Sequence, residues 1–127
     1  MMTVYTDGST DSNGLSGIGI VIKKEKNIFE YNFLIEEINT NHEAEFAAVK
    51  KALEICKDID QNEILSFRTD AKVVVDAIDK RYTGNDAFAP ILKDILALID
   101  TFPLFFIKWI PTNENKHADE LAKRAIR

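Results

Sequence analysis

Thr3-Val4-Tyr5-Thr6-Asp7-Gly8-Ser9 ends a run of strand-favouring residues on a carboxylate and follows it with two turn-favouring residues. The β-branched and aromatic types in Thr3–Asp7 predict a strand, and the Gly and Ser after it predict a turn. Two more β-rich segments follow, Gly17–Lys23 and Ile28–Ile35, separated by the turn-like Lys24–Asn27. Three consecutive strands with short connections predict an antiparallel meander.

Beyond the meander, helical and β-rich segments alternate. Apolar residues return at helical spacing from His42 to Cys56, and Thr40 or Asn41 is the expected N-cap. The remaining expected elements are a strand over Ile64–Thr69, a helix over Ala71–Lys80, a loop over Tyr82–Ala87, a helix over Ala89–Ile99, a strand over Leu104–Ile110 and a helix over Lys116–Arg127. This order predicts one mixed α/β domain over residues 1–127, whose five-stranded sheet joins parallel strands to the meander and is flanked by helices.

The composition fits one cytoplasmic domain. The chain has 127 residues, 46% of them hydrophobic, and no apolar run approaches the roughly 20 residues that a membrane-spanning helix needs. The single cysteine, Cys56, predicts a reducing compartment and a small core residue. A net charge of −5 counts against a strongly basic nucleic-acid binder, because affinity for phosphates comes largely from Lys and Arg.

Four carboxylates occupy positions where the fold would bring them together. Asp7 and Asp70 are expected at strand ends, where ligands bind in open α/β sheets. Glu45 and Asp119 lie near helix starts and head the inward-facing stripes of those helices. Burial of ionised carboxylates is costly unless they are paired or bind metal, and we expect no Lys or Arg at helical spacing on either stripe to neutralise them.

Each acid also has an ordinary explanation: a turn for Asp7, a helix cap for Asp70, and a favourable helix dipole for Glu45 and Asp119. Convergence of all four at one sheet edge would instead require cations. Hard divalent ions such as Mg²⁺ prefer oxygen ligands, and two of them are a known arrangement for phosphodiester cleavage. These four carboxylates carry four negative charges, which bound cations would neutralise. The net charge of −5 is then a weaker argument against nucleic-acid binding. Zinc is not expected, because the two histidines lack further His or Cys partners at suitable spacing.

These residues resemble the type I ribonuclease H family. The similarity covers nearly the whole chain, through Tyr5–Ser9, Thr40–Glu45, Thr69-Asp70 and Asn115–Ala122 in the family's order. It implies a ribonuclease H-like fold and metal ligation by the four carboxylates, which are Asp7, Glu45, Asp70 and Asp119. It also implies endonucleolytic hydrolysis of the RNA strand of RNA/DNA hybrids by two Mg²⁺ ions, or Mn²⁺, leaving 5′-phosphate and 3′-hydroxyl ends.

Four further residues are candidate substrate contacts. Asn13, Thr40 and Asn41 match family positions that hold the hybrid's backbone, and short polar side chains can reach 2′-hydroxyls across the minor groove. A turn role for Asn13 and a capping role for Thr40 or Asn41 remain open. Lys72 follows the third acid where the family commonly has Gln, and it is either an electrostatic contact or a solvated side chain.

The chain departs from many family members in two loops. Only residues 111–114 separate the last strand from the last helical motif, so the usual His-containing loop is missing, and the loop Tyr82–Ala87 replaces the basic protrusion. Short forms of this kind resemble archaeal and some bacterial members. We expect Trp109 and Phe105 to be core residues, and His117 to have a surface or packing role.

We expect a monomer whose partner is the RNA/DNA hybrid. Lys123, Arg124 and Arg127 on the last helix are either phosphate contacts or a solvated face. Two other functions stay open: a hybrid-binding module that has lost catalysis, and a nuclease of the same fold that acts on another nucleic acid.

Overall fold

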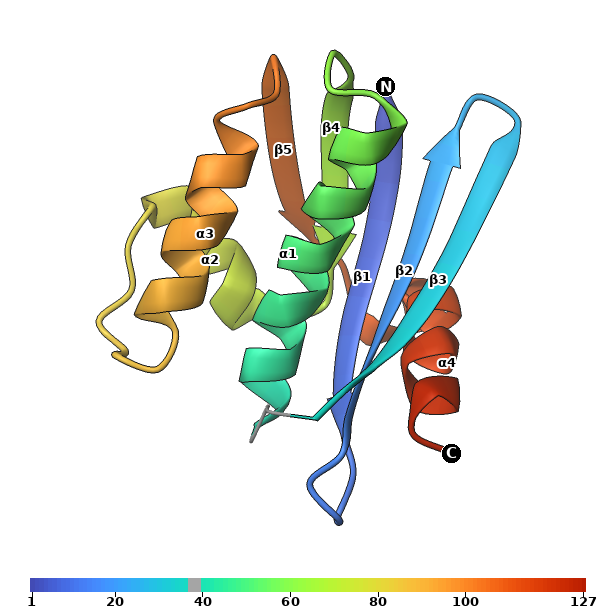
Figure 1. Cartoon of the computed structure of the whole chain (residues 1–127), viewed down its shortest axis with the longest axis vertical. Coiled ribbons are helices and arrows are strands. Elements are labelled where there is room, and N and C mark those ends of the chain that lie inside the picture. The colour runs from blue at the N-terminus through green and yellow to red at the C-terminus, as the bar shows by residue number, and fades with distance from the viewer. Residues whose placement is uncertain (37–39) are drawn as a thin grey trace.

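A five-stranded mixed sheet runs through the molecule in the spatial order β3-β2-β1-β4-β5 (Figure 1). The computed structural model describes residues 1–36 and 40–127. Its strands are β1 (Met2–Thr10), β2 (Ser16–Lys24), β3 (Asn27–Ile35), β4 (Ile64–Thr69) and β5 (Leu104–Trp109). Its helices are α1 (Asn41–Ile59), α2 (Lys72–Lys80), α3 (Ala89–Ile99) and α4 (Lys116–Ala125), with a 3₁₀ turn η1 (Thr112–Glu114) before α4.

The strand pairing confirms the predicted sheet. β1, β2 and β3 pair antiparallel, whereas β4 pairs parallel to both β1 and β5. One expectation was wrong, because β1 does not end at Asp7 but continues to Thr10. Its pairing with β4 stops at Tyr5, while its pairing with β2 continues to Thr10 opposite Ser16. Asp7 therefore lies just beyond the last residue of β1 that pairs with β4. Side chains have room there because the two strands are no longer paired.

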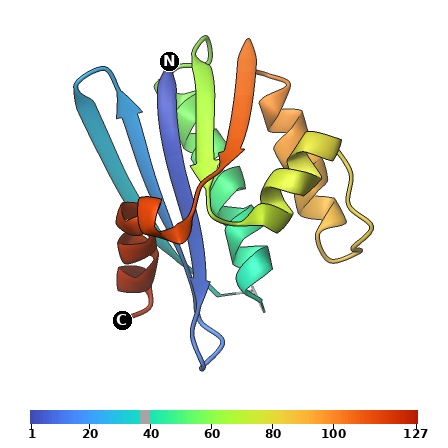
Figure 2. The ribbon, with the colours of Figure 1, turned by 180° about the vertical axis from the view of Figure 1, so that it is seen from behind.

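The helices cover the two faces of the sheet unequally. α1 and α3 pack on one face with α2 beside them, and α4 alone lies on the other (Figures 1 and 2). The main core lies under α1 and includes Phe46, Phe67 and Ile20, all almost fully buried. Cys56 is buried there as predicted, and burial raises the pKa of its thiol to about 12. None of the helices in the described part of the chain is both long and apolar enough to cross a membrane.

Most helix ends fall near their predicted positions. Thr40 is the N-cap of α1, since its hydroxyl oxygen accepts a hydrogen bond from the Glu43 N–H at 3.2 Å. α1 extends one residue earlier and three residues later than predicted, and α4 ends two residues earlier. Asp70 does not cap α2, because the N-cap position belongs to Ala71, which makes no side-chain capping bond.

Two glycines let helix backbones rest directly on the β1–β2 hairpin. A Cβ on Gly8 would lie 2.6 Å from the backbone nitrogen of Glu45 in α1. A Cβ on Gly19 would lie 2.1 Å from the carbonyl oxygen of Ala118 in α4. Both distances are far below van der Waals contact, so only glycine permits these approaches. Glu45 and Asp119 are thereby brought to the two sides of Asp7, which pairs with Gly19.

We predict that Gly19→Ala destabilises the protein by about 1–3 kcal/mol, because the new methyl group must push the α4 backbone away. A lower urea midpoint with an unchanged slope would show this loss. Gly84→Ala is the matched control, since its Cβ would meet only the Tyr82 hydroxyl at 3.7 Å. Equal midpoints for the two variants would contradict the close packing of α4 on β2.

Candidate active site

Asp7 is the most buried of the four predicted acids. It lies in β1 on the face that α4 covers, and only 6% of it is exposed. The carboxyl group of Asp119, which the first turn of α4 presents, is near enough to raise the pKa of Asp7. The two acids therefore belong to one cluster.

Asp70 joins the cluster from the end of β4. Its Oδ1 accepts a hydrogen bond from the Asn115 side chain at 3.3 Å, and its backbone oxygen accepts one from the Trp109 indole at 3.2 Å. The carboxylate is thus held by the segment that leads into α4. Since β4 runs parallel to β1 and Tyr5 pairs with Arg68, Asp7 and Asp70 each follow two residues after this last pair and lie at the same level of the sheet.

Glu45 approaches from α1, on the opposite side of the sheet from α4 (Figure 1). Its Oε2 lies 3.1 Å from His42 Nδ1, and 17% of its side chain is exposed. Burial raises the pKa of Glu45, the hydrogen bond and charge of His42 lower it, and the negative charge of Asp70 raises it further. The effect of Asp70 shows that Glu45 belongs to the same cluster.

The pKa of Asp7 is strongly raised, from 3.8 to about 9. Burial is the largest cause, and the carboxyl of Asp119 and the charges of Asp70, Asp119 and Glu45 add to it. The four predicted acids, from two strands and two helices, are thus near enough to affect one another. Burial and neighbouring negative charge both oppose the ionised form of Asp7, so an ionised Asp7 needs a positive charge beside it.

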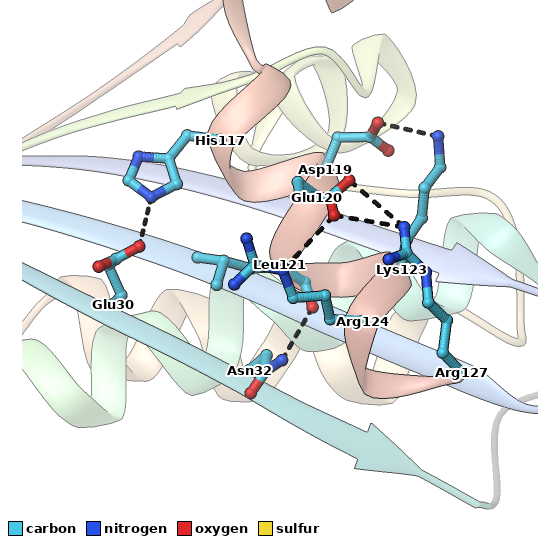
Figure 3. A network of polar contacts seen from close by, with 9 residues as sticks. All are labelled: Glu30, Asn32, His117, Asp119, Glu120, Leu121, Lys123, Arg124 and Arg127. Atoms are coloured by element: carbon cyan, nitrogen blue, oxygen red, sulfur yellow. Dashed lines mark hydrogen bonds and ion pairs between the residues drawn. The ribbon is translucent and has the colours of Figure 1, made fainter.

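Lys123 corrects one expectation from the sequence. It lies four residues after Asp119, and its Nζ is 3.0 Å from Asp119 Oδ2 (Figure 3). A lysine at helical spacing therefore does neutralise one acid. The hydrogen bond and charge of Asp119 raise the pKa of Lys123 in turn. The pair is half exposed, so the ammonium can leave the carboxylate without being buried elsewhere.

The donor set fits a hard divalent cation, because all four groups offer carboxylate oxygens. As they stand, the described residues contain no group of three or more acidic, His or Cys side chains already gathered as ligands. The reason is visible in their present partners: Asp119 is turned to Lys123, and Glu45 to His42. A cation would have to replace these two contacts.

Asn115 is a site residue that sequence reasoning did not single out. It is 1% exposed, and its side-chain amide donates hydrogen bonds to the Thr6 carbonyl at 2.9 Å and to Asp70. Its Oδ1 is buried and has no hydrogen-bond partner among the described residues. The signal in the sequence is an amide side chain immediately before a helix whose fourth residue is the acid Asp119. Asn115 fixes the distance between β1, Asp70 and α4.

The predicted substrate contacts lie in the β1–β2 turn, at the start of α1 and at the first turn of α2. Asn13 is exposed at the tip of the β1–β2 hairpin, where its N–H donates to Asp11. Asn41 Oδ1 accepts a hydrogen bond from the Thr10 N–H at 2.8 Å, so the hairpin and the start of α1 are neighbours. Thr40 caps that helix, and Lys72 is exposed at the first turn of α2. The Thr40 hydroxyl is itself engaged, because it also donates to Glu43 Oε1 at 3.1 Å.

Trp109 differs from its prediction as a core residue. Phe105 and Ile107 do pack against the core, but 48% of Trp109 is exposed. It is the last residue of β5 and borders a hollow with Lys72 and Asp76 instead of a core helix face. His117 has the predicted surface role, as its imidazole pairs with Glu30 on β3 (Figure 3).

Comparison with known proteins gives one consistent family. Residues 5–125 match the model of the family described as "Reverse transcriptase-like". EbsB of Enterococcus faecalis (strain ATCC 700802 / V583), whose name provisionally assigns it to the hydrolases, is 36% identical over 129 residues, which cover 99% of this chain and 94% of that protein.

Solved structures of type I ribonucleases H superimpose closely on this chain. The enzyme of the halophilic archaeon Halobacterium salinarum NRC-1 has a TM-score of 0.90 at 26% identity, over 98% of this chain and 96% of its own. LC11-RNase H1, solved in complex with an RNA/DNA hybrid, has a TM-score of 0.90 at 28% identity, over 99% of this chain and 96% of its own.

We predict that Asp7→Asn stabilises the metal-free protein at neutral pH by about 1–3 kcal/mol, or several degrees in melting temperature. The pKa of Asp7 is higher in the folded chain, near 9, than its ordinary 3.8. Its contribution to stability is therefore complete below about pH 4 and is lost as the pH rises toward 9. Thermal melts in EDTA across that range would fall for the wild type and stay flatter for the variant. Asp86→Asn, at an exposed loop position, is the control.

Lys123→Gln should tighten Mg²⁺ binding by about two- to fivefold, because it removes the ammonium group that competes for Asp119. Isothermal titration calorimetry on metal-free protein measures this directly. Arg124→Gln is the matched control, since Arg124 is similarly exposed on α4 but pairs with Glu120. The same change in both variants would mean that only the overall charge of α4 matters.

Proposed function

We propose, on the premise that this chain belongs to the reverse transcriptase-like family with its ribonuclease H fold, that it hydrolyses the RNA strand of RNA/DNA hybrids. The observation that supports this proposal best is that four acids lie near one another, which are Asp7, Glu45, Asp70 and Asp119. The chain is an enzyme of the hydrolase class by its relatives, and the hybrid bound in one structural neighbour supports this substrate.

We propose the four acids as ligands of two Mg²⁺ ions, for which Mn²⁺ could substitute. Bound there, the ions would activate a water for attack and stabilise the leaving oxygen, giving 5′-phosphate and 3′-hydroxyl ends. The protein's own task is positional. Asp7 and Asp70 project from the rigid sheet, Asn115 holds Asp70 in place, and the close contacts at Gly8 and Gly19 bring in the two helices. Such preorganisation lowers the barrier because nothing has to reorganise during the reaction.

The residues around the acids would hold the substrate. Asn41 contacts Thr10 of the hairpin that carries Asn13, and we propose that these two asparagines and Thr40 hold one part of the substrate while Lys72 at α2 holds another. Short amides and a hydroxyl suit 2′-hydroxyls and sugar–phosphate oxygens, whereas Lys72 suits a phosphate. Lys123 is the nearest cation to the acids and becomes available to a phosphate once a metal takes Asp119. We further propose that the protein acts in the cytoplasm as a monomer.

Two other functions compete with this proposal. A non-catalytic hybrid-binding module would gain nothing from four acids that repel one another and phosphate alike. A nuclease for a different nucleic acid would use the same metals, but the polar residues at the hairpin and α1 favour a ribose-containing strand. Cleavage tests on RNA/DNA hybrid, duplex RNA, single-stranded RNA and duplex DNA distinguish the three functions.

We predict that wild-type protein with Mg²⁺ or Mn²⁺ cuts an end-labelled RNA/DNA hybrid but not duplex RNA, single-stranded RNA or duplex DNA. Asp70→Asn should lower the rate by at least about 10²-fold, because it removes one charged ligand from the preorganised site. Loss of cleavage in Asp70→Asn, prepared in parallel, excludes a contaminating nuclease, and Asp86→Asn should retain full activity. Hybrid binding without cutting, by folded wild-type protein under either metal, would favour the binding module.

A further inference from the structure

The face of the sheet that α4 occupies is left open over β4, β5 and the first half of β1 (Figure 2). On this open face, Ile64 pairs across the strands with Leu104, and Ser66 pairs with Phe106. Ile64 is 37% exposed, Leu104 is 51% exposed and Phe106 is 56% exposed. Large apolar side chains gathered on an uncovered sheet face are typical of an interaction surface.

A row of cations runs beside these apolar residues. Arg68 pairs with Tyr5 on one side and with Lys108 on the other. Lys23 Nζ lies 5.1 Å from the centre of the Tyr5 ring, and the Arg68 guanidinium carbon lies 5.7 Å from it. The open face thus carries a basic row of Lys23, Arg68 and Lys108 next to an apolar row of Ile64, Leu104 and Phe106.

The basic row lacks counter-charges. None of the ion pairs among the described residues involves Lys23, Arg68 or Lys108, although the chain as a whole has a net charge of −5. Arg68 donates from Nη1 to the Tyr5 hydroxyl at 3.2 Å, but its Nε is buried without a hydrogen-bond partner in that part of the chain. Three unpaired cations in an acidic protein call for an anionic partner.

We propose that this open face docks an acidic, amphipathic segment of a partner protein. Its carboxylates would meet the basic row, and its apolar side chains would cover Leu104, Phe106 and Ile64. Alternation of acidic and apolar residues along an extended segment matches two neighbouring rows of a sheet.

A single-stranded nucleic acid fits the same face less well. Such ligands rely on bases that stack on exposed aromatic rings. Here the Tyr5 ring is already engaged by Lys23 and Arg68, and two of the three residues in the apolar row are aliphatic. Glu114 borders the hollow beside Tyr5 and Lys23 and disfavours any anion at that end of the row, so Arg68 and Lys108 are the cations that a partner's carboxylates would meet. A peptide brings carboxylates to the cations and aliphatic groups to the apolar row.

The test uses a short fluorescein-labelled synthetic peptide in which Asp and Glu alternate with Leu and Phe. Fluorescence anisotropy with metal-free, full-length protein measures its binding, so the result does not depend on nuclease activity. We expect Lys108→Glu to weaken binding by about tenfold and Phe106→Ser to weaken it severalfold. Lys93→Glu, an exposed charge reversal on α3, should change it less than about twofold. Circular dichroism melts verify that each variant is folded.

Four outcomes would overturn the proposal. The wild type could fail to bind the acidic peptide, or could bind a version with Lys in place of Asp and Glu equally well. Lys108→Glu could have no larger effect than Lys93→Glu, which would reduce the attraction to general charge. Finally, an oligothymidylate could bind more tightly than the peptide and lose affinity in Lys108→Glu, which would make the open face a nucleic-acid surface. Each series is run at low and at physiological salt, because screening weakens exposed charge pairs.

Discussion

The direct contact of two helix backbones with the β1–β2 hairpin places Glu45 and Asp119 beside Asp7. Gly8 and Gly19 give α1 and α4 approaches that no other residue would allow. The two glycines flank Asp7 in different ways, one next to it in sequence and the other opposite it across the strands. Any side chain at either position would move Glu45 or Asp119 away from Asp7. A constraint on packing is therefore also a constraint on the chemistry of the site.

That packing concentrates negative charge in a place where the protein compensates it only in part. Lys123 and His42 each engage one acid, and Asn115 donates to Asp70. Asp7 is left with a pKa near 9. A folded protein keeps such a destabilising arrangement when a ligand relieves it, and a divalent cation does so through oxygen donors. The contacts of Lys123 and His42 are partly exposed and can exchange for that ligand.

The unequal helix coverage of the sheet separates two surfaces with opposite charge. The acids lie where α4, α1 and the end of β4 meet, whereas the basic row lies on the part of the sheet that α4 does not reach. A net charge of −5 says nothing about this division. The acids suit metal ions and, through them, a polyanion, while Arg68 and Lys108 suit an acidic partner. One short helix both supplies Asp119 and, by its length, leaves the second surface open.

The sequence by itself determined the order and type of the elements, because hydrophobic periodicity and turn residues are local signals. It also pointed to the four acids, since carboxylates at the head of buried stripes conflict with burial. Tertiary structure alone decided that β1 runs past Asp7 and that Asn115 bridges β1 to Asp70. The exposure of Trp109 and of the basic row likewise depends on which helices cover which strands. Such coverage comes from contacts between residues far apart in the chain, and local patterns carry no information about them.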